Sequence, residues 1–385
     1  MPPCLCRELR VEQARWEFVN MEYGERERVF LAELSERGRR VREYLNSDEY
    51  RRRFSPNHIS DSAYSYLNSG GKALRPAILF FSCGAVGGDE SKALPAAAAI
   101  EVFHTWTLAH DDIIDSDKRR RGQPTLHEEF CRRGQEELML GAKDAKHYGL
   151  SVAILTGDLQ HGWSVSLLAE LTHKYGLSPQ LSLRLIEELN TYVTCNLLSG
   201  ELLDIQYSKL PVESLREEDI LSMLWKKTAV LYEFAGRAGA MIGLEVSEPH
   251  HPLVQALSLF ASRCGLAFQL QDDILGIVGD EEKLGKSVGS DIREGKKTTI
   301  VYYAFKKATA EQRRYLRGIL GNKRATEGRV REVADLLVEL GAVERTRSLA
   351  ERYVADAIEH LQKIPDSRYK QLLATWAEYI VCREF

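Results

Sequence analysis

The sequence lacks an uninterrupted apolar run of about 18 residues, the length that a membrane-spanning helix needs. It also lacks an excess of either charge, because 52 Lys and Arg stand against 56 Asp and Glu and the net charge is −4. The amino terminus carries Arg7, Glu8, Arg10 and Glu12 where a signal peptide would need an apolar stretch. We therefore expect no membrane span, no secretory leader and no nucleic-acid binding driven by bulk charge.

Cysteine is scarce and scattered. The seven cysteines are odd in number, and only Cys4 and Cys6 lie close together. A single Cys-x-Cys without a second pair is a weak metal signal, whereas scattered thiols are typical of a reducing compartment. We expect free thiols and a cytoplasmic location.

Linkers rich in Pro, Gly or Ser, internal repeats and alternating strand patterns are also absent. Apolar residues instead recur with helical spacing in long blocks, for example 93–117 and 252–276. We predict an all-α protein in which residues 28–385 form a single domain, a bundle of long helices around a central cavity. Residues 1–27 are predicted to be an extension, and residues 128–148 a surface insertion.

The first chemically informative stretch is an acidic cluster followed by arginines. Asp111, Asp112 and Asp115 place three carboxylates within five residues, and Arg120 and Arg121 follow directly. Carboxylate oxygens are preferred ligands of hard cations such as Mg²⁺, and arginine binds phosphate oxygens in a bidentate manner. This stretch indicates a site for a metal and an anion.

A second acidic cluster has the same form. Asp272 and Asp273 follow an apolar helical block, and Lys286 and Lys296 come after them in a glycine-containing segment. Either cluster alone would fit a helix cap or a solvated acidic surface. Both together, each with its basic residues, favour Mg²⁺ ions that hold a diphosphate between two walls.

Helical spacing places small or polar side chains on the same stripe as each acidic cluster. The first stripe contains His104, Thr107, Asp111 and Asp115, and the second contains Ser262, Gly265, Gln269, Asp272 or Asp273, and Gly276. If the two stripes face each other, they line a cavity with carboxylates at its mouth.

A basic segment precedes both clusters. Gly70 and Gly71 interrupt a helix, and Pro76 suits the first turn of the next one, so Lys72 and Arg75 lie at a helix start. Unpaired amides at a helix start favour an anion. The alternative is that both side chains are solvated surface charges.

Taken together, these segments resemble the motifs of the trans-isoprenyl diphosphate synthases, the family of farnesyl and geranylgeranyl diphosphate synthases. The resemblance extends from about residue 60 to the carboxyl terminus. Its motifs are Gly70 to Pro76 (GGKALRP), Asp111 to Asp115 (DDIID), Arg120 to Gly122 (RRG), Lys227-Thr228, Gln269 to Asp273 (QLQDD), and the lysines Lys286 and Lys296.

The resemblance implies a role for each of these residues. Mg²⁺ would be bound by Asp111, Asp115 and Asp272, with Asp112 and Asp273 as secondary ligands or orienting groups. The allylic diphosphate would be held by Arg120, Lys227, Lys286 and Lys296. The diphosphate of isopentenyl diphosphate would be held by Lys72, Arg75, His104 and Arg121. Thr228 and Gln269 would lie beside the reacting allylic carbon.

The reaction implied is the condensation of isopentenyl diphosphate with dimethylallyl, geranyl or farnesyl diphosphate by ionisation, condensation and elimination. The proton would be lost to the departing diphosphate, so His104 is expected to bind an anion and not to act as a base. The product would be an all-trans C15 or C20 prenyl diphosphate. The resemblance also implies a homodimer.

Product length is expected to depend on Trp106 and Thr107, which precede the first aspartate motif. The resemblance makes Trp106 a floor that blocks longer chains, whereas an alternative is that Trp106 only packs in the core. Two positions depart from the common pattern. Gly276 stands where some members carry a third Asp, and Glu201 stands where Gln is frequent.

Two other functions remain open at this point. A class I terpene cyclase also ionises an allylic diphosphate with Mg²⁺, but it needs no site for isopentenyl diphosphate such as Lys72 and Arg75 would form. A non-catalytic subunit of a heteromeric synthase would have lost its aspartate motifs, and this chain keeps both. An assay with and without isopentenyl diphosphate separates the first alternative, and addition of a partner subunit separates the second.

Overall fold

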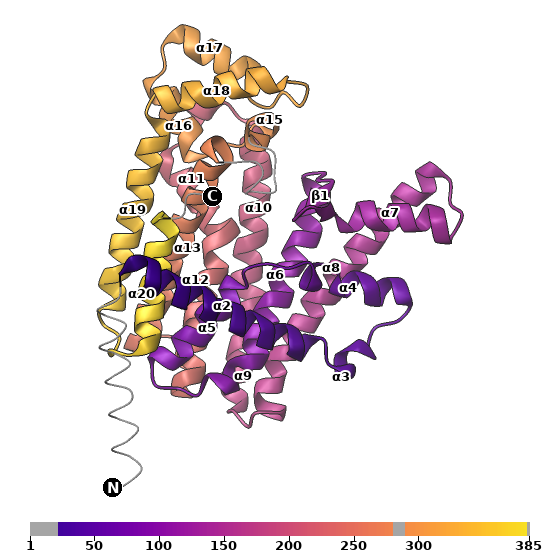
Figure 1. Cartoon of the computed structure of the whole chain (residues 1–385), viewed down its shortest axis with the longest axis vertical. Coiled ribbons are helices and arrows are strands. Elements are labelled where there is room, and N and C mark those ends of the chain that lie inside the picture. Colours follow the sequence, from indigo (N-terminus) through magenta and orange to yellow (C-terminus); the bar gives the residue numbers. More distant parts are fainter. Residues whose placement is uncertain (1–21, 280–288, 383–385) are drawn as a thin grey trace. The chain divides into compact units, whose positions relative to one another are not determined.

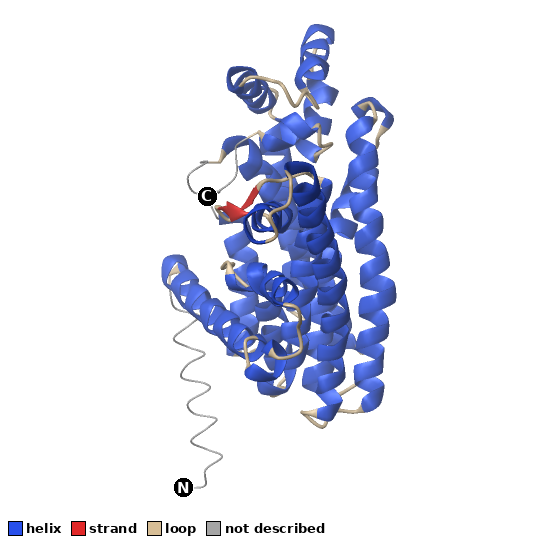
Figure 2. Cartoon of the chain, turned by 90° about the vertical axis from the view of Figure 1, so that its right-hand side faces the viewer, coloured by secondary structure: helices blue, strands red, loops and turns tan. Residues whose placement is uncertain are grey.

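The computed structural model describes residues 22–279 and 289–382. Within these ranges every element longer than two residues is helical, which confirms the predicted all-α class (Figure 2). Strands β1 (Arg119–Arg120) and β2 (Gln123–Pro124) form an antiparallel hairpin in which Arg120 pairs with Gln123. This hairpin directly follows the first acidic cluster.

The described chain divides into two compact units. The amino-terminal unit comprises residues 22–188 and 238–249, and the carboxy-terminal unit comprises residues 189–237, 250–279 and 289–382. The amino-terminal unit contains α2 (Tyr23–Leu45), α3 (Asp48–Arg51), α4 (Asn57–Asn68), α5 (Leu74–Ala85), the 3₁₀ turn η1 (Glu90–Ala93), α6 (Leu94–Ile114), the hairpin, α7 (Leu126–Glu137), α8 (Ala142–His173) and α9 (Pro179–Glu187).

The remaining elements belong wholly or mainly to the carboxy-terminal unit (Figure 1). They are the π-helical turn η2 (Glu188–Val193), α10 (Thr194–Lys209), the 3₁₀ turn η3 (Val212–Ser214), α11 (Glu217–Leu224), the π-helical turn η4 (Trp225–Ala229), α12 (Val230–Leu244), α13 (Pro252–Val278), α15 (Ser290–Glu294), α16 (Thr299–Lys307), α17 (Ala310–Ile319), α18 (Glu327–Glu339), α19 (Ala342–Leu361) and α20 (Arg368–Cys382). The chain changes unit within α12, after Arg237.

Helix α6 is the centre of the amino-terminal unit. Its run 96–99 consists of four alanines that are fully buried, and α2, α5 and α8 pack around it. Small side chains let neighbouring helices approach closely. On α8, a Cβ at Gly157 would lie 2.2 Å from Nε2 of His110, so glycine leaves room for the His110 ring where α8 meets the end of α6. This packing fixes the helix that carries the first aspartate cluster.

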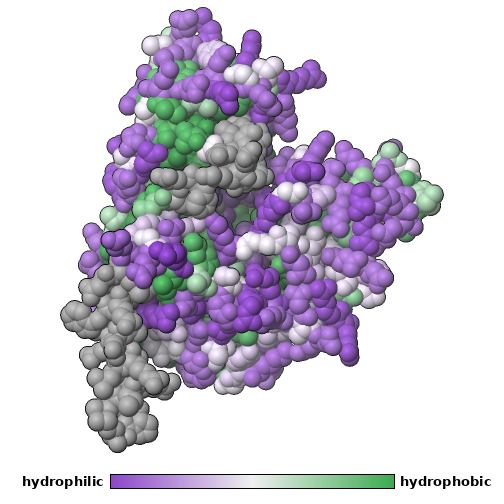
Figure 3. Space-filling model, viewed as in Figure 1, coloured by the Kyte–Doolittle hydropathy of each residue, from purple (hydrophilic) through white to green (hydrophobic). Residues whose placement is uncertain are grey.

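The predicted surface insertion 128–148 is a structural part of the unit. It forms most of α7 and the first turns of α8, and Phe130 and Ala145 are fully buried. Phe130 joins a core cluster with Tyr66 and Ala109, from α4 and α6. The segment reads as polar because it is amphipathic, and only one face of each helix reaches the core. Figure 3 shows a hydrophobic patch at the free end of α7, where Leu138 and Met139 are exposed.

Helix α13 is the corresponding core of the carboxy-terminal unit, where α19, α20 and η4 pack against it. Among the described residues it is the one helix long and apolar enough to cross a membrane, but 67% of its apolar window is buried inside the protein. Such burial is typical of a core helix.

The helical stretches 179–209 and 217–244 are interrupted by the π-helical turns η2 and η4. A π turn accommodates one extra residue without breaking the helix, so the apolar period of the sequence hardly reveals it. At the amino terminus, α2 begins at Tyr23, inside the predicted extension, and residues 1–21 lie outside the described residues. A single domain over 28–385 stays a prediction.

Candidate active site

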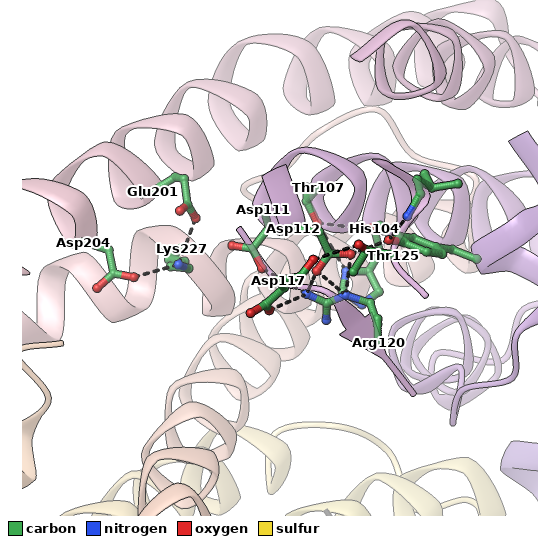
Figure 4. A network of polar contacts seen from close by, with 12 residues as sticks. His104, Thr107, Asp111, Asp112, Asp117, Arg120, Thr125, Glu201, Asp204 and Lys227 are labelled. Carbon is green, nitrogen blue, oxygen red and sulfur yellow. Dashed lines mark hydrogen bonds and ion pairs between the residues drawn. The ribbon is translucent and has the colours of Figure 1, made fainter. Parts of the chain in front are cut away.

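Asp112, the middle residue of the first aspartate cluster, is an anchor in the core of the amino-terminal unit. It is fully buried, and both of its oxygens accept hydrogen bonds from Nε of Arg120, at 2.8 and 2.9 Å. The hydroxyl of Tyr66 also donates to it and itself accepts from the amide of Leu126 at 3.0 Å. Figure 4 shows Asp112 in contact with Arg120, and its expected role as a secondary Mg²⁺ ligand or orienting group stays a prediction.

Arg120 connects Asp112 to Asp111, the next carboxylate of the cluster. Its Nη2 donates to Asp112 at 2.5 Å and to Asp111 at 3.3 Å. Burial lowers the pKa of Arg120, but the hydrogen bonds and charge of Asp112 and the charge of Asp111 outweigh burial and raise it. Arg120 therefore remains a cation beside the acidic cluster. Asp115 caps the end of α6, where its amide donates to the carbonyl of Asp111 at 2.8 Å.

The tight hairpin brings Arg121 to the predicted basic segment. Arg121 and Gly122 both adopt positive φ, which turns the chain back toward α4. The Arg121 guanidinium donates to the carbonyl of Gly70, and a Cβ at Gly71 would lie 2.8 Å from its Nη2. Glycine at position 71 thus leaves room for Arg121. Lys72 is exposed one residue later.

His104 faces this basic group from α6. Nη1 of Arg75 lies 3.2 Å from Nε2 of His104, and because arginine can only donate, Nε2 accepts. Burial, followed by the charges of Arg75, Arg121 and Arg120, holds the pKa of His104 well below its usual value. His104 is therefore a neutral imidazole that orients Arg75.

Glu101 is a site residue that the sequence reasoning missed. It lies three residues before His104 on the same stripe of α6. Burial raises the pKa of its carboxyl, and the charges of Arg121, Arg75 and Arg42 oppose that rise. One carboxylate thus lies among three arginines, so this group of side chains has a net positive charge. The spacing from His104 was the signal available in the sequence.

The two residues proposed to measure the product have different surroundings. Trp106 is 6% exposed, and its ring lies edge-on against those of Phe103 and His161, each with centroids 4.7 Å apart. This places it in the contact between α6 and α8. Thr107 donates to the carbonyl of His104 at 2.8 Å and is partly exposed. Their effect on product length stays a prediction.

In the carboxy-terminal unit, Lys227 projects from η4 between two carboxylates of α10 (Figure 4). Its Nζ lies 2.7 Å from Asp204 and 2.9 Å from Glu201. A Cβ at Gly200 would lie 2.4 Å from the backbone nitrogen of Lys227, so glycine lets α10 approach η4 closely. Glu201, the unusual residue at its position, therefore places a second negative charge on Lys227.

Thr228 and Gln269 form a hydrogen-bonded chain to the second aspartate pair. The Thr228 hydroxyl donates to Oε1 of Gln269 at 2.8 Å, and Nε2 of Gln269 donates to Asp273 at 2.9 Å. Asp273 is 5% exposed. Burial raises its pKa well above the usual range, and the charges of Asp291 and Asp272 add to this. The structure thus brings together Thr228, Gln269 and Asp273.

The glycine at position 276 makes room for another carboxylate. A Cβ there would lie 3.3 Å from Oδ2 of Asp291, a residue that the sequence reasoning did not select. Lys296, expected to bind diphosphate, has its Nζ 3.1 Å from Glu294. Lys286 lies outside the described residues.

Part of the second stripe is a helix contact and not a cavity wall. Ser262 is 3% exposed and donates to Glu233 on α12 at 2.9 Å. A Cβ at Gly265 would lie 2.9 Å from the ring of Tyr232 and 3.0 Å from Cα of Ala229. Helix α13 therefore uses its small residues to pack against η4 and α12. The two acidic clusters belong to different units, and a cavity between them stays a prediction.

The donor atoms fit a hard cation. Oδ2 of Asp273 is buried without a hydrogen-bond partner among the described residues, and Asp272 and Asp291 raise the negative potential around it. No group of three or more His, Cys, Asp or Glu side chains in the described ranges is arranged to hold a metal ion. Carboxylate oxygens such as those of Asp272 and Asp273 are the donors that Mg²⁺ takes, one or two at a time, together with waters and substrate phosphates.

Comparison with known proteins identifies the family. The polyprenyl synthetase family matches residues 56–337, which include both aspartate clusters and Lys227. The chain belongs to the polyprenyl synthetase family. It is 34% identical over 307 residues to the geranylgeranyl diphosphate synthase of Sulfolobus acidocaldarius, covering 80% of this chain and 84% of that protein. It is also 34% identical over 333 residues to the geranylfarnesyl diphosphate synthase of Aeropyrum pernix, covering 86% and 95%.

Solved structures agree with this assignment. Geranylgeranyl pyrophosphate synthetase from Pyrococcus horikoshii matches 93% of this chain and 99% of its own, with a TM-score of 0.78 and 31% identity. Geranylgeranyl pyrophosphate synthase from Corynebacterium glutamicum, solved with isoprenyl diphosphate and magnesium, matches 94% and 100% with a TM-score of 0.75 and 28% identity. This polyprenyl synthetase is accordingly an enzyme, a transferase of prenyl groups.

Proposed function

We propose that this polyprenyl synthetase condenses isopentenyl diphosphate with an allylic diphosphate and releases a short all-trans prenyl diphosphate, C15 or C20. The proposal rests on one observation above all. The aspartate clusters, their arginines and Lys227 all lie in the region shared with relatives named for geranylgeranyl and geranylfarnesyl diphosphates. The alternatives of a terpene cyclase and a non-catalytic subunit have no observation that favours them.

The group formed by Arg75, Arg121 and His104 suits the diphosphate of isopentenyl diphosphate. The guanidinium of Arg75 beside the half-buried imidazole of His104, with the charge of Arg121 nearby, supplies several donors for phosphate oxygens. Burial, followed by the charges of these arginines, holds the pKa of His104 well below its usual value in the free protein. A bound diphosphate would offset these charges, so the pKa of His104 would rise and the imidazole could then donate to the anion.

The carboxy-terminal group suits the allylic substrate. Lys227 is held by Glu201 and Asp204 and so presents a fixed cation to a departing diphosphate. Gln269 has a defined orientation, because its amide nitrogen donates to Asp273 and its oxygen accepts from Thr228. The oxygens of Thr228 and Gln269 are neutral dipoles that stabilise positive charge on carbon without attacking it as a carboxylate would.

The residues proposed to hold Mg²⁺ are Asp111, Asp115 and Asp272, with Asp112 and Asp273 orienting them. Bound Mg²⁺ would neutralise the charge that develops on the leaving diphosphate. The protein contributes the fixed positions of these side chains. Arg120 bonds to Asp112 and Asp111, and Gln269 bonds to Asp273, so the carboxylates are oriented before substrate arrives.

The deciding experiment is incubation with isopentenyl diphosphate and each primer of C5, C10 and C15, with Mg²⁺ or with a chelator, followed by determination of product chain length. We expect C15 or C20 products that require isopentenyl diphosphate and disappear with the chelator. Turnover of the primer alone to a hydrocarbon would support a terpene cyclase. Activity that appears only with a partner subunit would support a non-catalytic role.

A product of C25 or longer would contradict the short-chain part of the proposal and leave the condensation intact. We also propose a homodimer and a cytoplasmic location. Sedimentation of the purified protein tests the first, because a monomer at assay concentration would contradict it. Cell fractionation tests the second.

A further inference from the structure

Two π-helical turns of the carboxy-terminal unit share one buried carboxylate. Tyr192 belongs to η2, Trp225 is the first residue of η4, and both donate to Glu233 on α12. We propose that Glu233 is a positioning residue that holds η4 and thereby aims Lys227 and Thr228 at the allylic substrate. This inference rests on the proposed function of those two side chains.

Every contact of the Glu233 carboxylate that the structure describes comes from a donor. Oε1 accepts from Tyr192 at 3.1 Å and from Arg237 at 2.6 Å. Oε2 accepts from the indole of Trp225 at 3.2 Å and from Ser262 at 2.9 Å, and the same indole also donates to Oγ of Ser262 at 2.9 Å. Glu233 is only 6% exposed. A buried carboxylate that accepts four hydrogen bonds fixes the positions of the elements that supply the four donors.

These donors come from η2, η4, α12 and α13, so Glu233 fixes η4 relative to its surroundings. The rings of Tyr192 and Trp225 lie edge-on with centroids 6.3 Å apart, and the guanidinium of Arg237 lies 5.4 Å from the Tyr192 ring centroid. Lys227 follows Trp225 by two residues and Thr228 by three, within one π turn. A shift of the indole would therefore move both functional side chains.

The substitution Glu233→Gln tests the electrostatics without changing the shape. Trp225 and Arg237 can only donate, and they face different oxygens of Glu233. A glutamine amide therefore turns its own donor toward one of them, whichever way it flips. With the amide nitrogen on the Trp225 side, the indole keeps its 2.9 Å hydrogen bond to Oγ of Ser262 but loses Glu233, so η4 is released from α12 while it stays bonded to α13. With the amide nitrogen on the other side, it faces Arg237, which loses its acceptor on Glu233.

Glu170→Gln is the matched control. Glu170 is 7% exposed on α8 of the other unit, where Tyr44 and Tyr50 donate to it. The same chemical change there removes no contact of η4. It tests whether an effect at position 233 arises from any loss of a buried glutamate or from the link to Lys227.

For Glu233→Gln we expect kcat to fall about tenfold, because a small misplacement of reacting groups is enough for such a loss. The KM for the allylic diphosphate should rise while that for isopentenyl diphosphate changes less than twofold. Amide hydrogen exchange over residues 225–229 should accelerate about tenfold. Glu170→Gln should leave both KM values and this exchange unchanged.

A second variant keeps the test decisive where Glu233→Gln does not fold. Trp225→Phe removes the donor from η4, and it should reproduce the change in KM and in exchange. In the double variant Glu233→Gln with Trp225→Phe, the glutamine amide can donate to the hydroxyl of Ser262. The double variant should therefore show no larger change in KM or in exchange than Trp225→Phe alone. The positioning role would be overturned if the effects of Glu233→Gln and Trp225→Phe added in the double variant. It would also be overturned if Glu170→Gln changed KM and exchange as much as Glu233→Gln does.

The exchange measurement needs no turnover. An inactive parent enzyme with faster exchange in Glu233→Gln would refute the proposed function and support the link to η4. An active parent enzyme with unchanged KM and unchanged exchange in both variants would refute the link alone.

Discussion

The substitution Asp112→Asn should destabilise the protein by removing the charge that balances Arg120. Asp112 is fully buried, and the side chain of Arg120 is 12% exposed, so the remaining cation would be poorly hydrated. Breaking one partner of a buried ion pair costs about 3–5 kcal/mol. Because asparagine keeps one oxygen for Arg120 or Tyr66, we expect about 3 kcal/mol, measured as the loss in the free energy of urea unfolding.

Asp61→Asn makes the same chemical change in an exposed ion pair. Asp61 lies 2.9 Å from Nη1 of Arg133, and its side chain is 50% exposed. Exposed pairs contribute about 0–1 kcal/mol, so this control should change stability by less than about 1 kcal/mol. An Asp112→Asn variant as stable as the control would refute the anchoring role. In a double-mutant cycle of Asp112→Asn with Arg120→Met, the two losses in unfolding free energy should not add, because each variant removes one end of the same contact.

Three further predictions concern other parts of the site. Gly200→Ala should push α10 from η4, since its Cβ would meet the Lys227 nitrogen at 2.4 Å, and kcat should fall at least about tenfold in the prenyltransferase assay. Because the pKa of His104 is lowered from 6.5, the unfolded chain binds more protons below that value. The contribution of His104 to stability should therefore fall as the pH drops through 6.5, by at most about 1.4 kcal/mol per pH unit. In His104→Asn, the free energy of urea unfolding should depend less on pH between pH 5 and 7 than it does in the parent protein. Trp106→Ala should lengthen the product and destabilise the fold by about 3–5 kcal/mol.

Each of these predictions has a contradicting result. Full activity of Gly200→Ala would mean that α10 moves without disturbing Lys227, and Gly162→Ala, with open space at its Cβ, is the control. An unchanged pH profile in His104→Asn would mean that the imidazole titrates normally. An unchanged product distribution in Trp106→Ala would assign Trp106 to helix packing only.

Much of the site could be predicted because many of its residues lie close together in the sequence. Asp111, Asp115 and Arg120 lie within ten residues on one helix end and hairpin, and Gln269 and Asp273 are one helical turn apart. Such neighbours meet wherever the helix forms, since the i to i+4 spacing is a property of the helix itself. The all-α class followed from the same periodicity.

Partners supplied by other helices could not be predicted. Tyr66 reaches Asp112 from α4, and Glu233 ties Trp225 to Ser262 on α13. These contacts depend on which faces of distant helices pack together, and that choice is made by the whole core and not by any one segment.

The sequence by itself determined the helices, the two acidic clusters and the cations that follow them. Only the tertiary structure decided that Asp112 is an anchor, that His104 accepts from Arg75, that Trp106 packs against His161, and that Lys227 stands on a π turn between Glu201 and Asp204. Helical period is set by the backbone within a few residues, whereas a side chain's charge state and partners are set by desolvation and by neighbours that folding alone brings together.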